Sequence, residues 1–430
     1  MNLRPRAVTR RASYALGPIA FLFSLRCIAA AAWLSESGGP DMAMASAGRA
    51  AFAADATTIG SNPAGMVALR GTAVSVVAMP ISMDLEFRGS GETPGSAVNE
   101  QEMMSALSAF AMRQEGRWAV GVGAYGNVGL GCDFGREWSG SRAIVNAKLR
   151  SINLTPAVAY RLTDRLDVGA SIGAQYADVQ AGMAVSNEAI YYGPPSGLPD
   201  GRLRMKGHSW APAGSIGAAY QAGAGTRIGL AWTSAVAHSI DLDVDTSAVH
   251  PLLSGMLQQQ PSARLDFSLP QQVTLSAARQ VSGDTLLTAS AGWQQWSRFG
   301  HARLDATGQE APMFEDGLSD TWSAAIGLRH RVDRRWTLAT GIAYDSDPAG
   351  ASGTMPVYFP MAEQLRLAAG ADYQFSDALL LRVALSVISQ GKVTVSQDTY
   401  PVPLPGIPPV TGTISGSRVY VLGFTADYRP

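Results

Sequence analysis

The chain has 430 residues, of which 47% are hydrophobic and 16% are charged, and its formal net charge is −1. The charged fraction lies well below the roughly 25% that is usual for soluble domains. No run of about 18 uncharged apolar residues follows Ser35, which excludes a bundle of transmembrane helices. Low charge combined with 46 glycines is typical of a membrane β-barrel, in which each strand shows lipid only every second side chain. The net charge argues against a nucleic-acid partner.

The N-terminus has the pattern of a secretory signal peptide, which we predict to span residues 1–32. An apolar segment, Ala15–Leu25, is followed by the small residues Ala29–Ala32, which suit cleavage. The segment is preceded by four basic residues, Arg4, Arg6, Arg10 and Arg11. Cleavage near Ala32 leaves Cys132 as the only cysteine, so neither an internal disulfide nor a multi-cysteine zinc site can form.

From Gly71 onward the sequence repeats one unit. Two stretches in which apolar residues alternate with polar or small ones are joined by a short polar turn, and a long irregular loop follows them. The turns are Gln114–Arg117, Arg161–Arg165, Gln221–Gly225, Gln280–Asp284, Arg331–Arg335 and Gln374–Asp377. The long loops are expected at 84–104, 128–146, 183–205, 241–262, 300–317, 347–359 and 395–415. Six turns join twelve strands, and a first strand at Gly71–Ile81 and a last at Arg418–Tyr428 bring the number to fourteen.

The stretches alternate with the period of two that places every second residue on one face of a strand. In Leu166–Tyr176 the even-numbered residues are apolar, whereas the odd-numbered ones are polar or glycine. The stretches Trp336–Asp345 and Arg418–Tyr428 repeat this split and carry aromatic residues at their ends, where membrane barrels place aromatic girdles. A soluble β-sandwich would not need short turns on one side and long loops on the other. The pattern predicts an all-β fold, a transmembrane antiparallel β-barrel of 14 strands.

An even strand number places both ends of the barrel on the periplasmic side, together with the short turns, and the long loops outside. A barrel of this size has a lumen that must be occupied if solutes are not to leak. The segment Gly38–Arg70 is rich in alanine, glycine and serine and precedes the first strand, so we expect it to fold inside the lumen. The predicted domains are a signal peptide at 1–32, an N-terminal plug or hatch at 33–70 and the barrel at 71–430.

A motif in the predicted plug points to a known family. Ala45–Gly48, the acidic stretch Asp55–Thr58 and Asn62–Ala64 follow one another just before the first strand. In this order they resemble the outer-membrane family of the long-chain fatty acid transporter FadL and the toluene transporter TodX. Leu269–Val273 and Trp293–Phe299 also resemble family segments. One departure is the C-terminus, which ends Tyr428-Arg429-Pro430 where the family ends on an aromatic residue.

The resemblance implies passive uptake of hydrophobic small molecules, such as long-chain fatty acids or aromatic hydrocarbons, across the outer membrane of a Gram-negative bacterium. Family members capture the ligand between outer loops, pass it to a site in the lumen and release it when the hatch moves, with a lateral gap at a kinked third strand as the exit. No cofactor is implied, and we expect a monomer surrounded by outer-membrane lipid. An apolar ligand gains about 25 cal/mol per Å² on leaving water, so such a path needs apolar patches.

Two groups of residues are candidates for the hatch and for ligand capture. Asn62, Pro63 and Ala64 would form a fixed turn of the hatch, either for its movement or only as a structural junction. Apolar residues gather in two predicted loops that should be exposed to water. They would either form a groove that captures the ligand or only pack the loops against each other. They are Ile190, Tyr191 and Tyr192 in one loop, and Val249, Leu252, Leu253, Met256 and Leu257 in the other.

Two further candidates concern exit and charge. Gly126, Gly129 and Gly131 at the end of strand three would allow a bulge or a break in the ladder, although glycine is common in all these strands. Arg382 lies between Leu381 and Val383, which should face outward, so the alternation places Arg382 in the lumen more clearly than any other cation. There it could bind a ligand carboxylate. The alternative for Arg382 is a salt bridge to a lumen carboxylate. Other possible lumen cations are Arg150, Arg329 and Arg366.

Two competing functions remain open on the same barrel. One is a structural or adhesion protein of the cell surface, and the other is an outer-membrane lipase. The five histidines show no catalytic motif or metal-ligand spacing, and His208 and Ser209, although adjacent, face opposite sides of a strand. A Ser–His pair at the lipid boundary would favour the lipase. We therefore expect no enzyme, no catalytic residue and no metal site, and nothing in the sequence separates fatty acids from aromatic hydrocarbons or alkanes.

Overall fold

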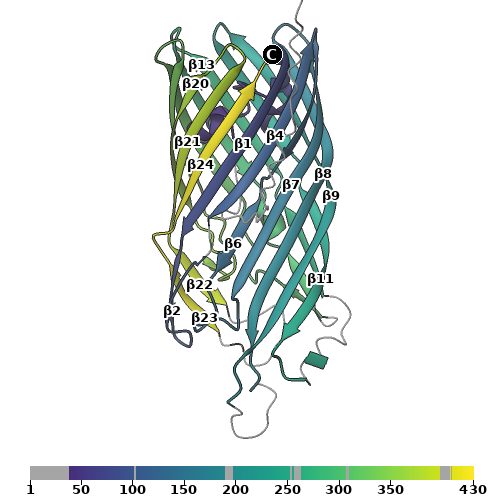
Figure 1. Ribbon diagram of the computed structural model, residues 1–430, viewed down its shortest axis with the longest axis vertical. Helices are drawn as coiled ribbons and strands as arrows, with labels where there is room; N and C mark the ends of the chain where they lie inside the picture. Colours follow the sequence, from purple (N-terminus) through teal and green to yellow (C-terminus); the bar gives the residue numbers. More distant parts are fainter. Residues whose placement is uncertain are drawn as a thin grey trace, which may run out of the picture.

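The chain folds as a closed antiparallel β-barrel in the computed structural model (Figure 1). The structure describes residues 38–100, 103–188, 197–251, 254–255, 263–306, 309–397, 407 and 409–430. Consecutive strands pair along the chain, and the last strand pairs antiparallel with the first, with Tyr428 opposite Val74. No helix in this part of the chain is long and apolar enough to cross a membrane.

The barrel has fourteen strand positions, as the sequence predicted. Eleven of them are single strands: β1 (Gly71–Asp84), β4 (Met104–Glu115), β7 (Asn146–Arg161), β8 (Leu166–Val185), β9 (Gly201–Gly223), β14 (Thr285–Gln294), β17 (Thr321–Arg331), β18 (Trp336–Asp345), β20 (Gln364–Gln374), β21 (Leu379–Gln390) and β24 (Arg418–Tyr428). Three positions are split in two: β5 (Trp118–Tyr125) and β6 (Gly129–Asp133), β10 (Thr226–Thr233) and β11 (Val236–Ser247), and β12 (Ala263–Leu269) and β13 (Gln272–Gln280).

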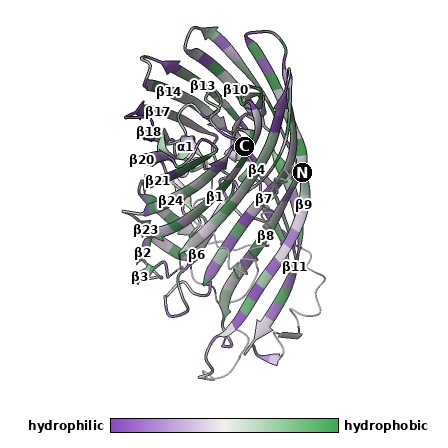
Figure 2. Ribbon diagram, turned by 45° about the horizontal axis from the view of Figure 1, so that its top comes forward, coloured by the Kyte–Doolittle hydropathy of each residue, from purple (hydrophilic) through white to green (hydrophobic). Residues whose placement is uncertain are grey.

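Side chains alternate between lipid and lumen along each strand, which Figure 2 shows as alternating hydropathy. In β8, Ile172 is 78% exposed on the outside of the barrel, whereas Asp167 is 7% exposed and faces inward. The lumen therefore collects the polar side chains, and the outer surface presents apolar ones to lipid.

The long loops contain more structure than the sequence predicted, because most of them form short strands. Five of these strands form a separate sheet at the end of the barrel opposite the C-terminus: β2 (Glu86–Ser90), β3 (Gly95–Val98), β19 (Thr354–Met355), β22 (Val393–Gln397) and β23 (Val410–Ile414). β15 (Arg303–Ala306) and β16 (Gln309–Pro312) form a hairpin beside β12. The loop expected at 241–262 begins later, since β11 continues to Ser247.

The N-terminal segment fills the lumen, which confirms the prediction of a plug inside the barrel. It contains α1 (Pro40–Ala43), α2 (Thr58–Ser61) and the 3₁₀ helix η1 (Pro63–Ala68). α1 contacts β18, β20 and β21, whereas η1 contacts β7, β8 and β9, so the plug spans the lumen from wall to wall. The limits of the signal peptide and plug at 32 and 33 lie outside the described residues and stay predictions.

The plug backbone lies directly on the barrel wall, at positions where the wall has glycine. A β-carbon at Gly229 would lie 1.8 Å from the carbonyl oxygen of Ala50, and one at Gly341 would lie 2.2 Å from that of Met44. Any side chain there would collide with the plug. Eight inward-facing glycines meet plug atoms in this way, and we call them the wall glycines: Gly121, Gly169, Gly217, Gly229, Gly327, Gly341, Gly370 and Gly423.

Wall hydroxyl groups bind the backbone of the plug between these glycines. Ser276 Oγ accepts a hydrogen bond from the Ala50 amide at 3.2 Å, and Ser290 Oγ accepts one from the Gly48 amide at 2.8 Å. The lumen thus satisfies plug backbone groups that no regular helix or strand would satisfy.

We expect Gly229→Val to displace the plug, because the new side chain would overlap Ala50. Single-channel conductance in planar bilayers should rise above that of the unmodified protein. Gly223→Val, at a glycine of β9 with no atom within 4 Å of its added β-carbon, is the matched control and should leave conductance unchanged. Unchanged conductance in a correctly assembled Gly229→Val barrel would show that the plug does not close the lumen through this contact.

Candidate functional site

An apolar cavity of about 140 Å³, here called the outer cavity, lies in the part of the lumen nearest the long loops. Phe299 comes from α4 (Trp296–Phe299), and it stacks on Phe359 with ring centroids 5.1 Å apart. Phe267 and Phe314 also line the cavity and lie against Phe299 at 5.8 and 5.7 Å. The sequence analysis missed this aromatic wall, although Trp293–Phe299 contributes one of its rings.

Lys148 is the one charged residue among the described residues that line the outer cavity. It lies on β7, opposite Gln180 of β8 and Gly131 of β6. A single ammonium group at the wall of an apolar space can bind an anionic end of an otherwise apolar molecule.

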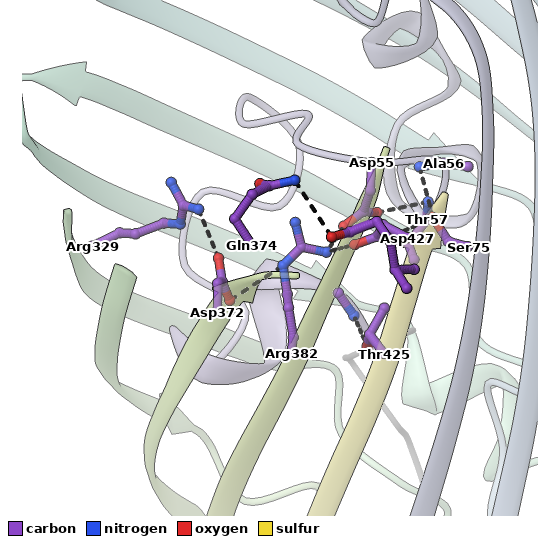
Figure 3. Close-up of polar contacts among 12 residues, drawn as sticks. Asp55, Ala56, Thr57, Ser75, Arg329, Asp372, Gln374, Arg382, Thr425 and Asp427 are labelled. Carbon is purple, nitrogen blue, oxygen red and sulfur yellow. Dashed lines mark hydrogen bonds and ion pairs between the residues drawn. The ribbon is translucent and has the colours of Figure 1, made fainter. Parts of the chain in front are cut away.

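The lumen arginines predicted as ligand cations are held by carboxylates. Arg382 lies in the lumen as expected, and its guanidinium contacts Asp55 of the plug at 2.6 Å, Asp372 at 3.2 Å, and Asp427 (Figure 3). The salt-bridge alternative therefore describes Arg382. The other three arginines form the pairs Arg150–Asp178 at 2.5 Å, Arg329–Asp372 at 2.7 Å and Arg366–Asp345 at 3.4 Å.

Asp55 joins the plug to this charge network. Its carboxylate accepts a hydrogen bond from the Thr57 amide at 2.9 Å and contacts Arg382 of β21. Because Asp55 and Arg382 are both almost fully buried, removal of one partner would leave a buried charge without compensation.

Asn62 ties the predicted hatch turn to both the plug and the wall. Its side-chain amide donates to the carbonyl oxygens of Ala50 at 2.6 Å and Ala218 at 3.1 Å, and its side-chain oxygen accepts from the Ala64 amide at 3.1 Å. Pro63 opens η1 directly after this cap. A role of Asn62, Pro63 and Ala64 in hatch movement stays a prediction.

Strand three is interrupted where the glycines were noted. β5 ends at Tyr125 and β6 begins at Gly129, so Gly126 lies in the interruption, whereas Gly129 and Gly131 lie in β6. β5 pairs with β4 as far as Ala124, but β6 pairs only with β7 in the described part of the chain. Residues 104–108 of β4 therefore pair with β1 on one side. On their other side they have no ladder partner among the described residues. Lateral exit through this break stays a prediction.

A chain of polar side chains, which the sequence analysis missed, holds the break. The side-chain oxygen of Asn127 accepts hydrogen bonds from Ser151 at 2.8 Å, Asn153 at 2.9 Å and Gln175 at 3.1 Å. Gln175 bonds in turn to His238 at 3.1 Å. No short sequence motif marks this cluster, because its members come from separate strands.

His238 also bonds Ser209 at 2.9 Å, which is a Ser–His pair of the kind that a lipase would need. However, His238 is only 3% exposed and faces the lumen, whereas the neighbour of Ser209, Trp210, is 61% exposed on the lipid side. The pair therefore does not lie at the lipid boundary, and it gives no support to the lipase hypothesis.

Comparison with known proteins identifies the family. Residues 20–429 match the model of the family described as outer membrane protein transport protein (OMPP1/FadL/TodX). The chain belongs to this family. It is 25% identical to a long-chain fatty acid transport protein of Escherichia coli O6:H1, over 89% of this chain and 92% of that one. It is 24% identical to outer membrane protein P1 of Haemophilus influenzae, over 93% and 92% of the two chains.

Solved structures of the family share the fold. A Pseudomonas aeruginosa FadL homologue aligns with a TM-score of 0.79 at 19% identity, covering 93% of this chain and 99% of that one. The toluene transporter TbuX of Ralstonia pickettii aligns with a TM-score of 0.65 at 19% identity, covering 92% and 99%. The family match and the curated relatives confirm the FadL/TodX-like resemblance and the predicted location in the outer membrane of a Gram-negative bacterium.

The predicted capture groove lies mostly outside the described residues. Ile190, Tyr191, Tyr192, Leu252, Leu253, Met256 and Leu257 are not described. Val249 is partly buried and packs against the apolar cluster around the outer cavity, and the adjacent His250 amide donates to Asn187 at 2.8 Å. The groove stays a prediction.

We expect Asp55→Asn to loosen the plug, because the amide cannot replace the charge that faces Arg382. A hydrogen bond to a charged group contributes roughly 1.5–3 kcal/mol, so amide hydrogen exchange in residues 38–60 should accelerate about tenfold or more. Mass spectrometry of the exchanged protein measures this. Glu86→Gln removes the carboxylate of the exposed Glu86–Arg88 pair and should leave plug exchange unchanged. Equal exchange in Asp55→Asn and the unmodified protein would contradict the role of Asp55.

Proposed function

We propose that this outer-membrane transport protein takes up long-chain fatty acids by passive diffusion and carries out no catalytic step. The observation that carries the proposal is the outer cavity. Its aromatic wall suits an acyl chain, and Lys148, the one charged residue among the described residues that line it, suits a carboxylate. The E. coli relative that is described as a long-chain fatty acid transport protein supports the same substrate class.

Aromatic hydrocarbons are the second candidate substrates. The volume of the outer cavity, about 140 Å³, is close to that of apolar protein cavities of about 150 Å³ that bind benzene. A monoaromatic ligand would fit without rearrangement, whereas a long acyl chain would have to extend beyond the cavity. Burial of each methylene contributes about 0.8 kcal/mol, so extension of a chain along an apolar path is favourable.

The break in strand three supports lateral release. Below the outer cavity the plug and its charge network fill the lumen, so a molecule that moved straight down would have to displace both. The stretch between β4 and β6, which has no ladder pairing in the described residues, supports a route sideways through the wall instead. An apolar molecule that leaves sideways never crosses the aqueous periplasm. One closed barrel contains the whole path, which supports a monomer.

Uptake of labelled oleate, toluene and hexadecane by cells lacking and carrying the protein tests the substrate class. We expect oleate uptake to depend on the protein and to fall several-fold in Lys148→Gln, because the carboxylate loses its counter-charge. Toluene uptake should not change in that variant. Lys392→Gln, which removes an exposed lysine between β21 and β22, is the control. Equal oleate uptake with and without the protein would refute the proposal.

Lateral release is tested by sealing the break. Cysteines replace Ala106 of β4 and Gly129 of β6 in a Cys132→Ser background, and a bifunctional thiol reagent bridges them. Delivery of oleate should stop while oleate binding persists. A bridge between cysteines at Ala109 and Ala124, which already face each other in the β4–β5 ladder, is the control and should leave delivery intact. Full delivery through the bridged break would favour hatch movement into the periplasm instead.

A further inference from the structure

The outward face of β9 carries a row of basic residues at its outer end. Arg202, Arg204 and Lys206, here called the basic row, alternate with Leu203 and Met205. Leu203 and Met205 are 1% and 7% exposed and belong to the apolar cluster around the outer cavity. Because successive side chains of a strand point to opposite faces, the basic row faces away from the lumen.

The basic row lies beyond the outer boundary of the apolar band. On the same face of β9, Trp210 is 61% exposed and lies against Tyr176 of β8 with ring centroids 5.2 Å apart. Outward-facing aromatic residues mark the level at which lipid chains meet head groups. Lys206 and Arg204 precede Trp210 by roughly 13 and 20 Å along the strand. β9, with its 23 residues, continues past β1 at this end of the barrel, so the row lies at the level of the head groups of the outer leaflet (Figure 1).

Positive charges crowd one another in the basic row. The charges of Arg136, which lies between β6 and β7, and of Arg204 lower the pKa of Arg202. A surface on which charges of one sign gather attracts ions of the opposite sign. An anion that bound between these side chains would relieve their repulsion.

The strands on either side of β9 leave the basic row available to a ligand. The residues of β8 opposite the row, Gln180, Gly182 and Ala184, carry no charge. On β11, Asp243 and Asp245 lie opposite Lys206 and Arg204, yet no salt bridge joins them to the row in the described part of the chain. Exposed pairs of this kind contribute little, so they would compete weakly with a ligand.

The chemistry of the basic row fits the phosphate groups of a lipid. A guanidinium binds phosphate through two parallel N–H···O bonds. Side chains on one face of a strand recur roughly every 7 Å, so the row extends over about 13 Å and can contact more than one phosphate. In the outer leaflet of a Gram-negative outer membrane, the lipid whose head group carries two phosphates is the lipid A part of lipopolysaccharide.

We propose that the basic row binds the phosphate groups of lipid A and holds one lipopolysaccharide molecule against β8 and β9. The acyl chains of that molecule lie against the apolar outer face of the same two strands, where Ile172 and Ile216 are 78% and 56% exposed. This site lies outside the barrel, so it depends neither on the transported molecule nor on the plug.

Binding of lipid A to the purified full-length protein in detergent, measured by native mass spectrometry, tests the proposal. Arg202→Gln, Arg204→Gln and Lys206→Gln together should weaken lipid A binding at least about tenfold, because charge-assisted hydrogen bonds to phosphate are lost. Lipid A from which both phosphates have been removed should bind the unmodified protein about as weakly as intact lipid A binds this triple variant.

Two further variants separate the basic row from general surface charge. Arg165→Gln, Arg279→Gln and Arg334→Gln together remove three exposed arginines in and beside the short turns and should leave lipid A binding unchanged. Asp243→Asn with Asp245→Asn removes the negative charges opposite the row and should strengthen lipid A binding several-fold. Electrophoretic mobility before and after heating establishes that each variant has assembled.

Three results would overturn the inference. They are unchanged lipid A affinity in the triple variant of the basic row, an equal loss of affinity in the variant of the turns, and equal binding of lipid A and phosphatidylglycerol to the unmodified protein. The first would leave the row a hydrated surface, and the second would reduce its effect to the total charge of the protein. The third would show that any lipid phosphate is sufficient and that the row does not select lipid A.

Discussion

The contact on which the rest of the structure depends is the close approach of the plug backbone to the barrel wall. At Gly229 and Gly341 the approach leaves no room for even one methyl group. A wide barrel without a plug would leak, and a plug held at a distance would need side chains and water between itself and the wall. Because the wall glycines remove that layer, hydroxyl groups and the Asp55–Arg382 pair can bind the plug directly.

This close fit determines where charge can be placed. The Arg382 guanidinium is surrounded by three carboxylates, from the plug and from two wall strands, so the inner half of the lumen has anionic groups that match its cations. Lys148 lies at the apolar outer cavity, apart from that network.

Period-two alternation and the six short turns were enough to predict the barrel, since a strand with one face in lipid and one in the lumen must alternate. The width of the lumen and the small residues of Gly38–Arg70 predicted the plug, and the family motif within that segment agreed with it. The outer sheet was not predictable, because β2 pairs with β23 more than 300 residues away and each has only five residues, too few for a pattern. The alternation of side chains along the strand predicted that Arg382 faces the lumen, but it could not show which carboxylates surround Arg382.

The break in strand three is an ordered part of the barrel wall. Unpaired backbone in a membrane is normally unfavourable, yet Asn127 receives three hydrogen bonds from β7 and β8, and these fix the interruption in an ordered conformation. On the proposed lateral route the break is therefore already present in the wall. The part that would have to change is the plug, which the wall glycines and the Asp55–Arg382 pair hold against the wall.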